Sequence, residues 1–142
     1  FLQIPGPTNV PDRILRAIEC PYVDVLGHPT GRRILKREGY RVNFDRLTEA
    51  AAAAGVAVEI NCQIERLDLD ENHARLARDR GVKVIIDSDA HSPAALGLLR
   101  WGVTVARRAW LEPGDVLNTL PVDAFRQSLR RNRGTRKRAR TR

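Results

Sequence analysis

The length, composition and charge of the chain bound what it can be. At 142 residues it is long enough for one domain with a hydrophobic core and too short for a typical barrel of about 250 residues. Its 42% hydrophobic and 30% charged residues are typical of a soluble globular protein. No apolar run approaches the roughly 20 residues of a membrane helix, and the first residues do not resemble a signal peptide. We therefore expect a cytoplasmic protein without a membrane partner.

Helices and strands are predicted to alternate along most of the chain. The expected order is helix 9–20, strand 22–28, helix 43–55, strand 56–61, helix 70–81, strand 82–87 and helix 92–102. Asn9, Asn43 and Asp70 are predicted N-caps, and Gly55 and Gly81 are predicted helix ends. Strands separated by helices pair in parallel with right-handed crossovers, so the pattern predicts an α/β fold.

The last part of the chain is less regular. We expect a fourth strand at 103–110 and short helices at 113–120 and 121–132. Trp101 and Trp110 are large apolar side chains near this end, and we expect both to pack in the core. Cys20 and Cys62 have no CxxC spacing, so they are expected to be reduced thiols rather than a disulfide or zinc ribbon.

The net charge of +8 is concentrated at the carboxyl terminus. Residues 130–142, RRNRGTRKRARTR, hold eight Arg and Lys and no acid, while cations and acids are balanced in the rest of the chain. We expect this basic tail to be disordered and attracted to polyanions. It has no aromatic residue for base stacking, so it would add affinity for a nucleic acid without sequence specificity. A solvated terminus that aids solubility is an equally good interpretation.

Polar residues gather where each predicted strand ends. His28 follows the first strand, Glu59 and Asn61 end the second, and Asp87, Asp89 and His91 end or follow the third. The carboxyl ends of parallel strands lie at one edge of a sheet, so these side chains are expected at one place. Imidazole and carboxylate groups suit zinc, manganese or iron, and such ions activate water for attack on phosphate esters. Metal ions at this edge could therefore bind a phosphate ester and activate water for its hydrolysis.

Each residue also has a purely structural interpretation. If the backbone stays extended, Asp87, Asp89 and His91 alternate and project to the same side, as three ligands of one metal would. Alternatively, Asp89 caps the helix that follows it, and His28 is a hydrogen-bonded turn residue. His73, in the middle of a predicted helix, is interpreted as a surface or packing residue.

The groups around the expected metal have two interpretations as well. Glu59 and Asn61 face the same side of their strand, so they would orient ligands or water, unless Glu59 only pairs with an Arg. Arg32, Arg33 and Arg66 lie in the loops after the first two strands and could hold a phosphate with two hydrogen bonds each. Their alternative is a set of solvated charges.

Three stretches resemble a known family. DVLGHPTGR, VEINCQIERLDLDENHARLARDRGVKVIIDSDAHS and WGVTVARRAWLEPGDVLNTLP are similar to the closing part of a PHP domain, the polymerase and histidinol phosphatase family. The version is similar to that appended to bacterial family X DNA polymerases, and the likeness extends over residues 13–121. The resemblance implies a distorted (βα)7 barrel, up to three divalent metal ions such as manganese or zinc, and 3′-5′ exonuclease or 3′-end phosphatase action on DNA.

The resemblance also assigns roles to residues. His28, Asp89 and His91 match metal ligands, and Glu59 and Asn61 match the strand beside the metal cluster. The role of Asp87 stays open, because its position is commonly small and hydroxylated in the family; nearby, Ile64 replaces a frequent Pro.

The family pattern begins with a His-x-His strand, which would precede Phe1 and is absent from this sequence. We therefore expect residues 1–129 to be the carboxyl-terminal part of a PHP domain and 130–142 to be the basic tail, with the amino-terminal half and a polymerase domain elsewhere in the parent chain. Such a fragment would be weak or inactive alone. The alternatives are a non-catalytic remnant that binds nucleic acid through its tail, and a phosphatase acting on a small molecule such as histidinol phosphate.

Overall fold

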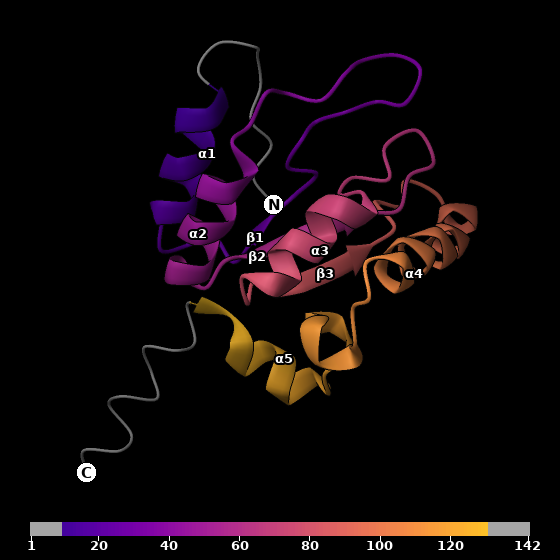
Figure 1. The fold of residues 1–142 in the computed structure, drawn as a ribbon. Helices are drawn as coiled ribbons and strands as arrows, with labels where there is room; N and C mark the ends of the chain where they lie inside the picture. The colour runs from indigo at the N-terminus through magenta and orange to yellow at the C-terminus, as the bar shows by residue number, and fades with distance from the viewer. Residues whose placement is uncertain (1–9, 131–142) are drawn as a thin grey trace.

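The chain folds into alternating helices and short strands (Figure 1). The structure is a computed structural model that describes residues 10–130. Its elements are α1 (Val10–Glu19), β1 (Val25–Leu26), α2 (Phe44–Ala54), β2 (Ala57–Asn61), α3 (Glu71–Asp79), β3 (Val84–Asp87), α4 (Leu99–Arg108) and α5 (Val122–Ser128), with 3-10 helices η1 (Pro93–Leu98), η2 (Pro113–Asp115) and η3 (Leu117–Thr119). The predicted alternation is confirmed from α1 to β3. Asn9, the predicted cap of α1, and most of the basic tail lie outside the described residues.

The strands form one parallel sheet in the order β1-β2-β3. Val25 pairs with Ala57, and the β2–β3 register runs from Val58 opposite Val84 to Asn61 opposite Asp87. This confirms the α/β class and the parallel pairing. The three strands form an open sheet rather than a closed barrel, so the larger (βα)7 architecture remains a prediction.

Local sequence signals set the ends of the middle helices. The Asn43 side chain accepts a hydrogen bond from the Arg46 amide and begins α2, and Gly55, with φ of 67°, ends it. The Asp70 carboxylate accepts hydrogen bonds from the amides of Asn72 and His73 and begins α3. These three predicted caps are therefore confirmed.

Helices α1 to α4 pack side by side in chain order, and α2, α3 and α4 contact the strands. The core between them is aliphatic and includes Ile18, Leu26, Leu47, Val58 and Ile60, each nearly or fully buried. Helix α4 lies close to the sheet because it has no side chain at Gly102, where a Cβ atom would overlap the Cys62 sulfur and lie 2.7 Å from the Ile86 side chain.

The predicted strand at 103–110 is wrong, because most of this segment belongs to α4. The buried residues in and just after α4 have helical spacing, so one face of the helix lies against the sheet. They are Gly102, Val105, Ala106 and Ala109. Packing on that face overrides the local strand preference of the Val and Thr residues. The side chains of Trp110 and Trp101 are 70% and 38% exposed, so the expectation that both pack in the core is wrong.

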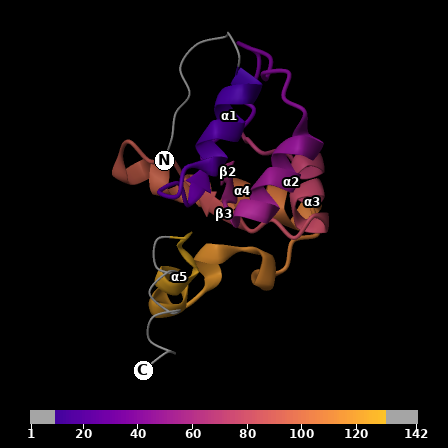
Figure 2. The same cartoon turned by 90° about the vertical axis from the view of Figure 1, so that its left-hand side faces the viewer.

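The segment after α4 covers the free edge of β3. Val116 forms a parallel bridge with Val84, and the Asn118 amide accepts from the Ile86 amide at 3.1 Å and donates to the Ile86 carbonyl at 2.8 Å. Figure 2 shows this segment and α5 on the side of the sheet away from α1 and α2. No helix within residues 10–130 is long and apolar enough to cross a membrane.

Arg130, counted above as the first residue of the basic tail, contacts the folded body. Its guanidinium donates to the carbonyls of Ile18 and Cys20 near the end of α1, at 2.9 and 2.8 Å. Its amide donates to the Asp24 carboxylate at 2.6 Å. Arg130 therefore provides hydrogen bonds to carbonyl groups at the end of α1 and belongs to the folded part of the chain.

Candidate active site at the carboxyl edge of the sheet

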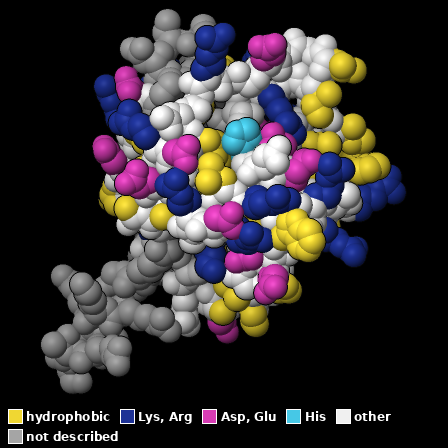
Figure 3. Space-filling view, in the orientation of Figure 1, with side chains coloured by type: hydrophobic (Ala, Val, Ile, Leu, Met, Phe, Trp, Pro, Cys, Tyr) yellow, Lys and Arg dark blue, Asp and Glu magenta, His cyan; other side chains and the backbone are white. Residues whose placement is uncertain are grey.

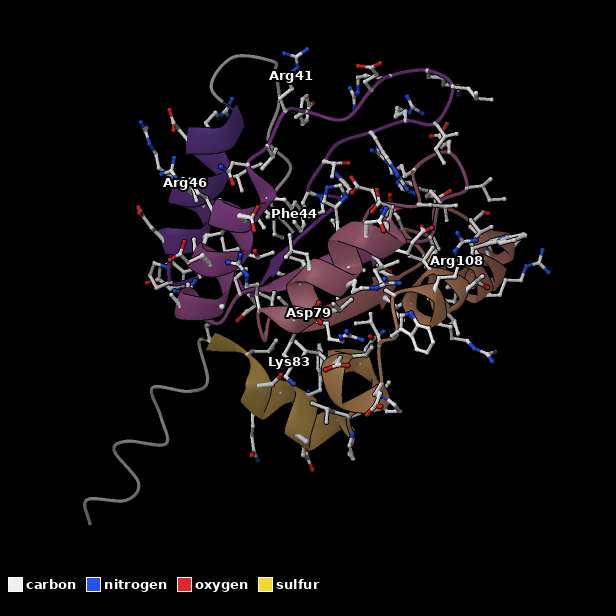
Figure 4. The ribbon with its side chains drawn as sticks, viewed as in Figure 1. Arg41, Phe44, Arg46, Asp79, Lys83 and Arg108 are labelled. Atoms are coloured by element: carbon white, nitrogen blue, oxygen red, sulfur yellow. The ribbon has the colours of Figure 1, made fainter. Side chains whose placement is uncertain are left out.

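The ends of all three strands contribute to one polar cluster. The His28 amide, just after β1, donates to Oε2 of Glu59 on β2 at 2.5 Å. The Asn61 amide nitrogen, at the end of β2, donates to Oδ2 of Asp89 at 3.1 Å and lies 3.5 Å from Oε1 of Glu59. The structure thus brings His28, Glu59, Asn61 and Asp89 together. The cluster lies at the edge opposite to Asp79 and Lys83, which Figure 4 labels near the end of α3.

Glu59 is the electrostatic centre of this cluster. Its side chain is fully buried, and burial raises its pKa to about 8, with a smaller contribution from the charges of Asp87 and Asp89. The hydrogen bonds from His28 and Asn61 act in the opposite direction. A cation bound beside these carboxyl groups would lower the Glu59 pKa again.

The chain after β3 leaves the extended conformation. Strand β3 ends at Asp87, and Asp89 has a left-handed φ of 49°. The alternation that would align Asp87, Asp89 and His91 on one side therefore does not continue past Asp87. The Asp89 amide lies 3.3 Å from the Asp87 carboxylate, and Nδ1 of the exposed His91 lies 2.7 Å from the Asp89 carbonyl.

The donor types at this edge suit a divalent metal, but their number does not make a complete site. Within residues 10–130, no three His, Cys, Asp or Glu side chains converge as a group that could hold an ion. Any ion held by His28, Asp89 and His91 would therefore need further ligands from outside these residues. Their role as ligands remains a prediction.

A second buried carboxylate, Asp68, holds the loop that carries His28. Asp68 is fully buried, and its Oδ2 accepts from the amides of Thr30 at 3.1 Å and Gly31 at 2.9 Å. Pro29 has no amide hydrogen, so carboxylates bind every N–H from His28 to Gly31. Burial raises the Asp68 pKa, although the bonds from Thr30 and the nearby Arg32 charge oppose this shift.

The sequence patterns do not single out Asp68 as a site residue. A single acid between Leu67 and Leu69 was a possible signal, because an acid in an apolar context is buried only when it is paired or hydrogen-bonded. Gln63 was missed as well. Its side-chain amide donates to the carbonyls of Ser88 at 3.0 Å and Asp89 at 2.8 Å, which ties the loop after β2 to the loop after β3.

Two of the three predicted phosphate-binding arginines hold loops together. The Arg32 guanidinium donates to the Arg66 carbonyl at 2.7 Å and pairs with Asp70 at 3.1 Å. Arg33 forms an ion pair with Glu65. In this structure Arg32 and Arg33 are thus paired with other residues rather than solvated, which neither interpretation had predicted. Among the described residues, no hydrogen bond or ion pair involves the Arg66 side chain.

Comparison with known proteins agrees with the motifs. No family model matches the chain. Over 84% of its length the chain is 38% identical to the DNA polymerase/3'-5' exonuclease PolX of Bacillus subtilis, of which it covers 21%. It is 34% identical over 75% of its length to a probable phosphatase of Thermoanaerobacter sp. (strain X514), and 31% identical over 84% to one of Caldanaerobacter subterraneus, covering 43% and 47% of these proteins.

The open parallel sheet with a polar carboxyl edge, together with homology to these relatives over part of their lengths, is consistent with a fragment of a PHP domain. In particular, the chain is homologous to PolX over part of that protein's length, which confirms the resemblance seen in the motifs. The chain spans less than half of each of these relatives.

Proposed function

We propose that this chain carries the carboxyl-terminal part of a metal-dependent phosphoesterase site that removes or trims 3′ ends of DNA. The observation that supports it most is the contact among His28, Glu59, Asn61 and Asp89, which come from three successive strand ends. Homology to a polymerase/exonuclease and to probable phosphatases supports the same chemistry. The partner would be DNA, and the compartment the cytoplasm.

In this proposal, His28, Asp89 and His91 would hold manganese or zinc. The metal, when bound, would polarise the phosphate ester and lower the pKa of a bound water. Asn61 would keep the Asp89 carboxylate in place, and Glu59 would hold the backbone of His28. Further ligands would have to come from outside residues 10–130, because no three candidates converge within them.

Arg66 would contribute a cation for the phosphate, because its side chain has no ion pair among the described residues. Arg32 and Arg33 would act mainly by shaping the loops, since both are engaged with Asp70 and Glu65. The basic tail would add sequence-independent attraction to the DNA backbone, which weakens as salt rises.

Metal content tests the proposal directly. The 142-residue chain is incubated with manganese or zinc, freed of excess ion and analysed for bound metal. Its hydrolysis of 3′-end-labelled DNA, which we expect to be weak because ligands are missing, is then measured over a long incubation. Asp89→Ala combined with His91→Ala should lose both signals, while the exposed Glu49→Ala should keep them. Retained metal and hydrolysis in the double variant, with an unchanged circular dichroism spectrum, would show that the assigned ligands are wrong.

A second candidate function is nucleic-acid binding without catalysis. It is favoured by the incomplete set of converging ligands and by the charge excess of residues 130–142. Binding should then fall steeply with salt, disappear when residues 131–142 are deleted, and be insensitive to a chelator. Metal-dependent hydrolysis that persists without those residues would exclude it.

A phosphatase acting on a small molecule is the third candidate, since several relatives are probable phosphatases. Histidinol phosphate and 3′-phosphorylated DNA ends, offered side by side to the same preparation, separate this candidate from the first. Faster turnover of the small ester would favour it.

A further inference from the structure

The loop between β1 and α2 contains a tight turn at residues 33–37. Arg33 and Arg37 form an antiparallel bridge, with backbone hydrogen bonds of 2.9 and 2.7 Å between them. Leu35, at the tip, has a φ of 60° and is completely exposed. A left-handed leucine costs about 1 kcal/mol of backbone energy, and an exposed one gains nothing from burial. Folding alone therefore does not explain a leucine at this tip.

The turn faces the loop after β2 across a hollow. The Ile34 amide donates to the Glu65 carbonyl at 2.6 Å, and Lys36 pairs with the Glu65 carboxylate at 3.0 Å. A cavity of about 400 Å³ lies between the two loops, lined by Ile34, Leu35, Gln63, Ile64, Glu65 and Leu98. Four of these six residues are aliphatic, and Ile64 is 56% exposed. Such a concentration of exposed aliphatic side chains at one site indicates a contact surface.

The charge of Glu65 is compensated within this wall. Its two partners, Arg33 first and then Lys36, lower its pKa to about 2, so it stays ionised and paired. The cavity wall therefore combines four aliphatic side chains with a charge-paired carboxylate and the Gln63 amide. Figure 3 shows hydrophobic side chains along the right-hand margin of the molecule, with Lys and Arg side chains among them.

The hollow adjoins the candidate active site on one side and a basic surface on the other. Gln63 lines the cavity and donates to the Asp89 carbonyl at 2.8 Å. Beyond Ile34 and Leu35, a second hollow of about 450 Å³ is lined by the turn itself, including Arg32, Arg33, Lys36 and Arg37. An apolar wall, a basic surface and the site for phosphate chemistry are thus neighbours.

We propose that Ile34, Leu35 and Ile64 form a subsite for an unpaired nucleobase of a single-stranded nucleic-acid end. A base has flat apolar faces that can be buried against aliphatic side chains whatever its identity, and its flanking phosphates are attracted to cations. A hollow of this size suits a single small group. This inference rests on the proposed function and makes it more specific, because it selects frayed or single-stranded ends over small phosphate esters.

The test measures binding without turnover. The 142-residue chain, labelled at its Ile and Leu methyl groups, is titrated in EDTA with a short oligothymidylate and separately with deoxyribose 5-phosphate, which lacks a base. We expect the methyl resonances of Ile34, Leu35 and Ile64 to shift with the oligonucleotide and not with the sugar phosphate. Leu35→Gly keeps the left-handed backbone while removing the side chain, and it should weaken oligonucleotide binding about tenfold, as loss of one buried leucine contact predicts.

Val122→Ser is the matched control, because it removes an aliphatic side chain that is 69% exposed on α5. It should leave binding unchanged. Equal shifts with the sugar phosphate, or wild-type affinity in Leu35→Gly, would overturn the subsite. Failure of the proposed function gives a different result. The methyl resonances would still shift with the oligonucleotide in EDTA, but the chain would show no metal-dependent hydrolysis.

Discussion

The two faces of β2 are equally buried and chemically opposite. Val58 and Ile60 lie on the face toward the helices, where the Ile60 side chain would be 3.5 Å from a Cβ atom at position 102 of α4. Glu59 and Asn61 lie on the other face and hydrogen-bond to the loops after β1 and β3. One face is therefore hydrophobic core and the other is the candidate site. Burial alone does not separate core residues from site residues, whereas the alternation of a strand does.

The two faces are also expected to contribute oppositely to stability. Aliphatic side chains on the helix face stabilise the fold through burial and close packing. On the site face, removing carboxyl groups from water costs free energy, and hydrogen bonds to backbone amides offset part of that cost. Substitutions that separate these contributions test the comparison.

The largest effect is expected on the helix face, at Gly102. Gly102→Val places a side chain where the Cys62 sulfur and Ile86 already lie, and overpacking of this kind costs about 3 kcal/mol. The free energy of unfolding from urea denaturation should fall accordingly. Gly97→Ala is the control, since nothing lies within 4 Å of its added Cβ atom. Equal stability of the two variants would show that α4 does not pack closely on the sheet.

In the loop after β2, Asp68→Ala should lower the free energy of unfolding by about 2 kcal/mol. It leaves the amides of Thr30 and Gly31 without their acceptor, but it also removes a buried carboxyl group. Hydrogen exchange at these two amides should accelerate more than at core amides. Asp68→Asn retains an acceptor oxygen and should be milder in both measurements. Unchanged hydrogen exchange in the alanine variant would show that Asp68 does not hold the loop that carries His28.

Asn118 allows the edge of β3 to be tested separately from both faces. Asn118→Ala removes two hydrogen bonds to Ile86 at an exposed position, so a loss of about 1 kcal/mol is expected. Asn118→Asp can still accept from the Ile86 amide but cannot donate to its carbonyl, so it should lose stability as well. If only the alanine variant were destabilised, the bond to the Ile86 carbonyl would be unimportant.

The smallest effect is a pH dependence at the start of α3. The hydrogen bond to Asp70 raises the His73 pKa above its usual value, despite partial burial. Its stabilising contribution is therefore complete below a pH of about 6.5 and is lost as pH rises through the higher folded pKa. Because the ring is partly exposed, we expect less than about 1 kcal/mol.

Thermal unfolding of wild type and His73→Gln between pH 6 and pH 9 measures this contribution. The wild type should lose more of its stability over this range than the variant does. Parallel pH profiles for the two proteins would mean that the contact with Asp70 does not stabilise the protonated ring.

Features that depend on near neighbours were predictable from the sequence. Asn43, Gly55 and Asp70 act on amides or carbonyls within a few residues, so the ends of α2 and α3 followed from local patterns. The parallel sheet followed from alternating helices and strands, and this order also placed His28, Glu59, Asn61 and Asp89 at one edge. PHP-like motifs indicated the relationship that the comparisons confirm.

Only the tertiary structure decided the contacts between distant segments. Asp68 meets Thr30 and Gly31 across 38 and 37 residues, and Gln63 meets Asp89 across 26, so no local pattern reports them. Residues 103–108 are helical because Val105 and Ala106 are buried against the sheet, which outweighs the strand preference of the Val and Thr residues. Local hydrogen bonds are encoded by neighbouring residues, whereas burial and buried-carboxylate contacts depend on the assembled fold.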